Sequence, residues 1–179
     1  YKSEVSKSLK NKISKDSITY NEIKSQSKLI PEFFDSFPGV FKQIKNIKKP
    51  KNVVIIGCGS SFNSAMLGKL YFEKVSNIPT EIFRPSEFTF FKDNKKTLYI
   101  FLSQSGETAD ICDLLESNKE YFSNSLSIVN SFDSRLVNGT KNYVNLNLGI
   151  EKGVAATKTF IGQIVALYLI SSYFNGQTS

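Results

Sequence analysis

From Asn52 onward, short apolar runs alternate with segments long enough to form helices, and this alternation constrains the fold more than any other feature of the chain. A parallel pair of strands needs a long crossover connection, so this pattern favours parallel neighbours. The expected strands are NVVIIG (Asn52–Gly57), TEIFR (Thr80–Arg84), TLYIFL (Thr97–Leu102), SLSIVN (Ser125–Asn130) and NYVNLNL (Asn142–Leu148). We therefore predict an α/β fold with an open, doubly wound, five-stranded parallel sheet flanked by helices.

Three helical segments are expected between and after these strands. Apolar residues recur at helical spacing in Ser60–Val75 and in Glu107–Phe122, and a third helix is expected over about Ala155–Phe174. The apolar stretch Phe160–Phe174 is shorter than the roughly 20 residues that a membrane span needs. It is interpreted as a buried helix, and no membrane partner is expected.

The excess positive charge lies at the N-terminal end of the chain. Residues 1–51 contain 12 lysines and 5 acidic side chains, whereas residues 52–179 contain 11 basic and 11 acidic ones. We interpret residues 1–50 as a solvated, basic helical lead-in and residues 51–179 as one compact domain. Nucleic-acid binding is not expected, because the lysines are scattered and the lead-in has no helix-turn-helix pattern.

Cysteine and histidine usage excludes several classes of site. The chain contains two cysteines, Cys58 and Cys112, and no histidine. A disulfide scaffold or a Cys/His zinc site is therefore not expected, and neither is any other metal or cofactor. The first fifteen residues are rich in Lys and Ser and lack an apolar core, so no secretory signal is expected. These features predict a reducing, cytoplasmic location.

The loop after the first strand reads GCGSSF (Gly57–Phe62). Its glycine spacing is similar to a dinucleotide-binding fingerprint, but Phe62 stands where a third small residue is needed, and Arg84 stands where an acid is needed. The hydroxyls of Ser60 and Ser61 leave two interpretations open. They either contact a ligand at the N-terminus of the following helix or simply cap that helix.

The loop after the third strand reads SQSGET (Ser103–Thr108) and contains no basic residue. Ser103, Ser105 and Thr108 offer three short hydroxyl donors, and Gly106 lets the backbone approach a ligand closely. The following helix adds unpaired N–H groups and a partial positive charge. One hydroxyl would suffice to cap the helix, so this loop predicts a phosphate-binding turn made of neutral donors.

The loop after the fifth strand reads GIEKGVAATK (Gly149–Lys158). Glu151 is the only candidate here for a catalytic base, and it can also accept a bond from a sugar hydroxyl. Glutamates at such positions more often cap a helix or pair with a cation, so both interpretations stay open. Cys58 is a poor candidate nucleophile, because the chain has no histidine to activate it.

The ordered motifs GCGSS, PSEF, SQSGETAD and EKGVAATKTF, between Lys51 and Tyr173, resemble the SIS (sugar isomerase) domain family. Within that family they are most similar to the first of the two SIS domains in the isomerase half of glucosamine-6-phosphate synthase and related phosphosugar isomerases. The resemblance implies a flavodoxin-like three-layer sandwich. It also implies a sugar phosphate such as fructose 6-phosphate as the ligand, a role in amino sugar metabolism and a homodimer.

The resemblance also implies roles for individual residues. The phosphate is expected to bind Ser103, Gln104, Ser105 and Thr108. The sugar is expected to lie against Ser60, Ser61, Val154 and Ala156. The family usually has serine where this chain has Ala156, so a side-chain hydrogen bond at that position is lost.

In the synthase-like proteins, the catalytic base, an active-site lysine and the ring-opening histidine come from the second SIS domain or from a neighbouring subunit. This chain is therefore expected to be the first of two SIS domains, belonging to an isomerase, aminotransferase or deglycase, and to bind its ligand without turnover. Two alternatives stay open from the sequence. One is a sugar-phosphate-sensing regulatory module, and the other is a stand-alone isomerase that depends on Glu151.

Overall fold

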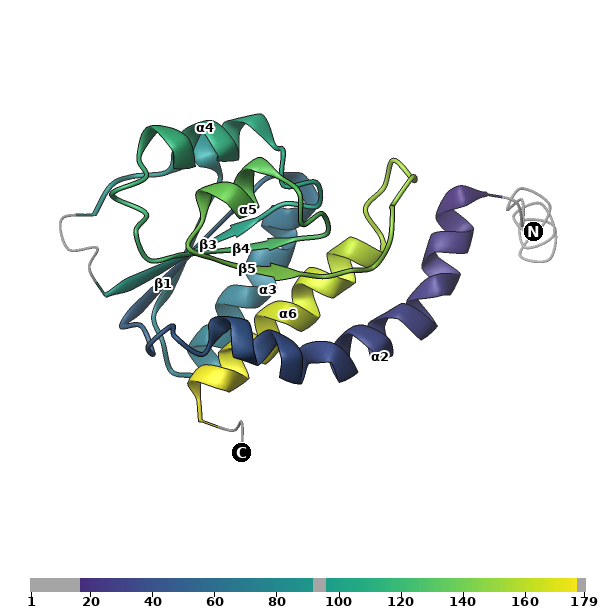
Figure 1. Ribbon diagram of the computed structural model, residues 1–179, viewed down its shortest axis with the longest axis horizontal. Coiled ribbons are helices and arrows are strands. Elements are labelled where there is room, and N and C mark those ends of the chain that lie inside the picture. Colours follow the sequence, from purple (N-terminus) through teal and green to yellow (C-terminus); the bar gives the residue numbers. More distant parts are fainter. Residues whose placement is uncertain (1–16, 92–95, 177–179) are drawn as a thin grey trace, which may run out of the picture.

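The computed structural model describes residues 17–91 and 96–176 (Figure 1). Its centre is a sheet of five parallel strands in the order β2-β1-β3-β4-β5. The strands are β1 (Asn52–Gly57), β2 (Thr80–Phe83), β3 (Thr97–Leu102), β4 (Ser125–Val129) and β5 (Asn142–Asn145). This sheet confirms the predicted doubly wound α/β fold.

Helices cover both faces of the sheet (Figure 1). They are α2 (Ile18–Ile44), α3 (Gly59–Lys74), α4 (Ala109–Ser117), α5 (Arg135–Gly139) and α6 (Lys158–Phe174), with a short 3-10 helix, η1 (Pro85–Glu87). The helices α2, α3 and α6 lie on one face, and α4 and α5 lie on the other (Figure 1). The result is the expected three-layer sandwich.

Alternate side chains along each strand separate two hydrophobic cores. In β1, Val53 and Ile55 pack into the core beneath α2, α3 and α6, whereas Val54 and Ile56 pack into the core beneath α4 and α5. All six residues of β3 are buried, as expected for a central strand that is covered on both faces. The apolar runs of the sequence are therefore continuous, because both faces of each central strand require apolar side chains.

Several elements are shorter than predicted, among them α4 and β5. The helix α4 begins at Ala109 rather than Glu107, because the residues before it form a turn of their own, and it ends at Ser117 rather than Phe122. The strand β5 ends at Asn145, and Asn147 then takes a left-handed backbone conformation with φ 50°. The apolar residues that follow β5 are still buried, which explains why their pattern resembles a longer strand.

The helix α2 is not simply a solvated lead-in, because its C-terminal half belongs to the first core. Phe33, Phe37, Val40 and Ile44 are buried there, at spacings of three to four residues along one helix face. The N-terminal half of α2 extends past the sheet (Figure 1). The first sixteen residues of the predicted lead-in lie outside the described residues.

Among the residues that the structure describes, no helix combines the length and the apolar character needed to cross a membrane. The helix α6 contains the longest apolar stretch, and it buries Gln163 along with apolar residues such as Leu167 and Ile170.

The substitution Phe37→Ala is expected to lower the free energy of unfolding by about 3–5 kcal/mol, because it opens a cavity in the first core. Phe37 is 1% exposed, whereas Phe34, three residues away on the same helix, is 50% exposed. Phe34→Ala is the matched control and is expected to change stability by less than about 1 kcal/mol. Equal losses in urea unfolding of the two variants would show that α2 does not belong to the core.

Candidate functional site

The loop that leaves β3 turns sharply before α4 begins. Gly106 has a φ of 71°, a left-handed conformation that side chains other than glycine rarely adopt. A Cβ atom at this position would also collide with the side chain of Ser134. Gly106 is therefore required both by the backbone conformation and by close packing, which explains the glycine in SQSGET.

The hydroxyls of this loop organise the turn. The Ser103 side chain is buried, and its Oγ accepts a hydrogen bond from the Gly106 N–H at 3.0 Å and lies 2.8 Å from Thr108 Oγ1. The Oγ of exposed Ser105 accepts a bond from the Glu107 N–H at 3.1 Å. Each hydroxyl carries one proton, so Ser105 and one member of the Ser103–Thr108 pair keep a donor that can bind an oxyanion.

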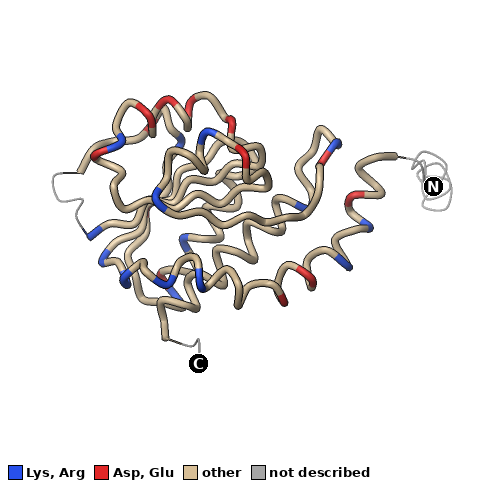
Figure 2. Tube along the Cα trace, viewed as in Figure 1, with Lys and Arg blue, Asp and Glu red and all other residues tan. Residues whose placement is uncertain are grey.

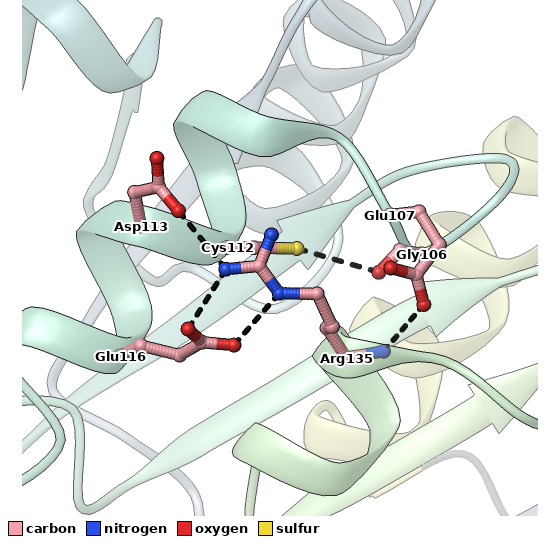
Figure 3. A network of polar contacts seen from close by, with 6 residues as sticks. All are labelled: Gly106, Glu107, Cys112, Asp113, Glu116 and Arg135. Carbon is pink, nitrogen blue, oxygen red and sulfur yellow. Dashed lines mark hydrogen bonds and ion pairs between the residues drawn. The ribbon is translucent and has the colours of Figure 1, made fainter.

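Arg135 ties this turn to the helices beside it (Figure 3). Its backbone N–H donates to Glu107 Oε1 at 2.7 Å, and its guanidinium bonds to both oxygens of Glu116 at 2.8 and 2.9 Å and to Asp113 Oδ1 at 2.9 Å. The Cys112 Sγ contacts the Gly106 carbonyl at 3.5 Å. The guanidinium holds the pKa of the Glu116 carboxyl below its ordinary value. Arg135 thus links the turn to α4 through its backbone and its side chain.

A cavity of about 340 Å³ opens at the carboxyl edge of the sheet, between the loops that follow β3, β4 and β5. Gln104, Ser105 and Glu151 are the predicted site residues that line it. The other lining residues are Asn130, Ser131, Phe132, Asn145, Asn147, Gly149 and Ile150. This position agrees with the rule that ligands of open α/β sheets bind beyond the carboxyl ends of the strands.

Asn130 joins the three loops around the cavity. Its backbone N–H donates to the Gln104 carbonyl at 2.9 Å, its Nδ2 donates to the Gly149 carbonyl at 2.7 Å, and its Oδ1 accepts from the Leu148 N–H at 2.9 Å. From the sequence, Asn130 was expected only as the last residue of a strand. A polar residue that directly ends an apolar strand was the available signal.

The loop after β1 places its two serines differently. Ser60 is exposed, whereas Ser61 is buried and its Oγ accepts a bond from Gln163 Nε2 of α6 at 3.0 Å. Neither serine lines the cavity beside Ser105. In this structure Ser61 therefore connects α3 to α6, and only Ser60 is freely accessible.

Glu151 caps the N-terminus of α6. Its Oε1 accepts bonds from the Thr157 N–H at 2.8 Å, the Thr157 hydroxyl at 2.9 Å and the Thr159 N–H at 3.4 Å. Its Oε2 is buried and lacks a hydrogen-bond partner among the described residues. Burial raises the pKa of the Glu151 carboxyl, but the hydrogen bonds from Thr157 and Thr159 together outweigh it and lower the pKa. Glu151 therefore has the helix-capping role, which was one of the interpretations that the sequence left open.

The segment between Gly149 and Thr157 is held from a distance by Glu22 of α2. This carboxylate is 7% exposed and accepts bonds from the Lys152 N–H at 2.6 Å and the Gly153 N–H at 3.2 Å. Val154, predicted to line the sugar pocket, is fully exposed, and Ala156 is half-buried. The role of Glu22 was missed because 131 residues separate it from Gly153.

The described residues contain no group of three or more His, Cys, Asp or Glu side chains arranged to hold a metal ion. Burial is the largest cause of a raised pKa for the thiols of both Cys58 and Cys112. Both cysteines are free thiols. A raised pKa disfavours the thiolate, which makes either residue a poor nucleophile.

Comparison with known proteins identifies the family of the chain. The sequence model of the SIS domain matches residues 46–172. Glutamine–fructose-6-phosphate aminotransferase (isomerizing) from Cyanidium caldarium is 38% identical over 191 aligned positions, which cover 96% of this chain and 30% of that protein. The enzyme of the same name from Wigglesworthia glossinidia brevipalpis is 38% identical over 156 positions, which cover 86% and 25%.

Two solved structures are similar in fold. The C-terminal domain of glucosamine-fructose-6-phosphate aminotransferase from Francisella tularensis has a TM-score of 0.78 at 26% identity and covers 94% of this chain and 51% of that chain. Glucosamine-6-phosphate deaminase from Thermotoga maritima has a TM-score of 0.72 at 26% identity, with coverages of 89% and 49%. This chain spans less than a third of the two curated relatives and about half of each solved chain. On its sequence match and its fold, the chain belongs to the SIS domain family.

Proposed function

We propose that this chain is the phosphosugar-binding domain of a larger enzyme that acts on fructose 6-phosphate or a similar sugar phosphate. The observation that carries the proposal is the SQSGET turn, with its left-handed Gly106 and its remaining hydroxyl protons, at the edge of a cavity of about 340 Å³. A cavity of this size suits a small ligand. The relatives named as fructose-6-phosphate aminotransferases support the choice of sugar phosphate.

In this proposal the phosphate binds Ser103, Gln104, Ser105 and Thr108. The N-terminus of α4 lies directly behind the turn and adds backbone donors and a partial positive charge. The turn itself contains no lysine or arginine. Its attraction for phosphate therefore comes from hydrogen bonds and dipoles. A site made of such neutral donors can also release its ligand.

The sugar itself is proposed to lie between Ser60, Ser61, Val154 and Ala156. Val154 is fully exposed and Ser61 is bonded to Gln163. The proposal therefore requires the loop after β5 to close over the ligand, and it requires the Ser61 hydroxyl to donate its own proton to the sugar while still accepting from Gln163.

Isomerisation of a sugar phosphate needs a base beside the reacting carbons. Glu151 has a lowered pKa and uses one oxygen to cap α6, so it is a weak base in a fixed position. We propose that a second SIS domain in the longer protein supplies the catalytic groups, and that this chain alone binds without turnover. We further propose a cytoplasmic homodimer, the arrangement expected from the family resemblance.

Fructose 6-phosphate at about 100 times its dissociation constant is expected to add roughly 2.7 kcal/mol of stability and to raise the unfolding temperature by roughly 5–10 °C. Free fructose is expected to have little effect, because it lacks the phosphate. Ser105→Ala is expected to weaken binding about tenfold to a hundredfold, because it removes a hydrogen bond to a charged group. The measurement is thermal unfolding followed by isothermal titration.

The control is Ser27→Ala, which removes an exposed hydroxyl on α2 that bonds only within its own helix. Unchanged affinity in Ser105→Ala, with normal binding in the control, would place the phosphate elsewhere. A rise with free fructose equal to that with fructose 6-phosphate would refute phosphate recognition altogether.

Glu151→Gln tests whether this residue acts as a helix cap or as a base. A carboxyl whose pKa is lowered in the folded state stabilises the protein above its unfolded pKa, and this contribution disappears as the pH falls through the folded pKa. The variant is therefore expected to lose roughly 1 kcal/mol at pH 7, and this loss is expected to shrink as the pH falls through the lowered pKa of the folded Glu151 carboxyl. Urea unfolding at several pH values measures this difference. A loss of stability that does not shrink in acid would argue against the helix-capping role. If this chain has isomerase activity and Glu151→Gln abolishes it, Glu151 acts as a base.

Glu22→Gln is expected to weaken fructose 6-phosphate binding several-fold and to leave inorganic phosphate binding unchanged. Its new amide group faces the Gly153 N–H, so the loop beside the sugar loosens while the SQSGET turn is untouched. Parallel titrations with the two ligands separate these effects. Glu32→Gln is the control, since Glu32 is an exposed carboxylate on the same helix. Equal weakening of both ligands would mean that Glu22 acts on the whole fold and not on the sugar loop.

A further inference from the structure

A second cavity, of about 570 Å³, lies at the amino edge of the sheet, opposite the proposed sugar-phosphate site. Its lining comes from segments that immediately precede β1, β3, β4 and β5. The lining residues are Asn46, Lys48, Lys49, Pro50, Lys51, Lys96, Ser123, Asn124 and Lys141. Five of these nine residues are lysines, and none of them is acidic.

The strand register places two of these lysines side by side. Asn52 pairs with Thr97 in the parallel β1–β3 ladder, and the residue before each of them is a lysine. The Lys51 N–H donates to the Lys96 carbonyl at 2.9 Å, so the two backbones are hydrogen-bonded at this point. Neighbouring strands lie about 5 Å apart, and like charges directly opposite each other destabilise a sheet. The register therefore brings two residues of like charge next to each other in the lining of this cavity.

No carboxylate within residues 17–91 or 96–176 forms an ion pair with any of the five lysines. Figure 2 shows Lys and Arg gathered around the edge where the strands begin, whereas Asp and Glu gather along α4. A concave surface lined by charge of one sign concentrates counter-ions. An anion bound here would relieve the repulsion between these lysines.

We infer that this cavity, called here the lysine cavity, binds a compact oligophosphate. Ammonium groups are point-charge donors suited to phosphate oxygens. Asn46, Ser123 and Asn124 add neutral groups that can bond to the remaining oxygens. The volume lies within the range of small-molecule sites, and the lining residues converge from four separate segments of the chain. These features fit a small polyanion better than a nucleic-acid strand.

The lysine cavity differs from the proposed sugar-phosphate site in chemistry as well as in position. The SQSGET turn is proposed to bind one phosphate with neutral donors, whereas the lysine cavity offers five cations, which suit several negative charges at once. No residue lines both cavities. Binding at one edge therefore does not require binding at the other, and the inference does not rest on the proposed function.

The test is isothermal titration of tripolyphosphate into the full chain at low ionic strength, where charge interactions are least screened. The double variant Lys51→Gln/Lys96→Gln is expected to weaken binding at least about tenfold. Its unfolding temperature without ligand is expected to equal or exceed that of the unmodified chain, because the repulsive pair is gone. A merely structural role for these lysines would lower that temperature.

The matched control is Lys24→Gln/Lys28→Gln, which removes the same charge from the N-terminal half of α2 and is expected to keep tripolyphosphate binding within about twofold. Ser105→Ala is also expected to keep it. Equal loss in both double variants would overturn the inference, since net charge alone would then explain binding. Loss in Ser105→Ala would overturn it by placing the anion in the SQSGET turn. Tighter binding of a 20-nucleotide single strand would overturn it in favour of a nucleic-acid surface.

Discussion

The complete burial of β3 is the constraint on which the rest of the structure depends. Layers of helices cover both faces of this strand, and β1 and β4 cover both of its edges, so a polar side chain within it would have no access to water. The first polar residues after β3 are therefore the first that can meet a ligand. The sharp turn at Gly106 keeps these polar residues at the edge of the sheet, and α4 begins a few residues later.

The two edges of the sheet have opposite chemical characters because of the same topology. Every strand runs in one direction, so every crossover returns to the amino edge and every strand exits at the carboxyl edge. Small hydroxyl and amide residues gather where the strands exit, and lysines gather where they enter. The helix α2 and the segment after it contribute to both edges. Glu22 accepts hydrogen bonds from the loop after β5, and the segment after Ile44 lines the lysine cavity.

The strands were predictable because both faces of a central strand demand apolar side chains, a local signal that a single sequence carries. The SQSGET turn was predictable for a similar reason, since entry into a helix needs one capping hydroxyl and this turn offers three beside a glycine. The contacts of Gln163 and Glu22 were not predictable, because each joins segments far apart in the chain. The burial of α2 was missed because its scattered lysines indicate a solvated helix, although Phe37 and its neighbours form an apolar face.

The structure also limits what each predicted residue can do. Ser103 is too deeply buried to act alone and contributes through its bonds to Gly106 and Thr108. Ser105 is exposed at the rim of the cavity and is the residue best placed to meet a phosphate. The proposed function therefore places phosphate recognition in one short turn, and it places the sugar against loops that hydrogen bonds from Gln163 and Glu22 hold in position.

A crystal structure of the chain with fructose 6-phosphate tests the central claim most directly. We predict phosphate density within hydrogen-bonding distance of Ser105 Oγ and of backbone N–H groups between Ser103 and Thr108, with the sugar directed toward the loop after β5. Phosphate density in the lysine cavity alone, or anywhere away from the SQSGET turn, would contradict it.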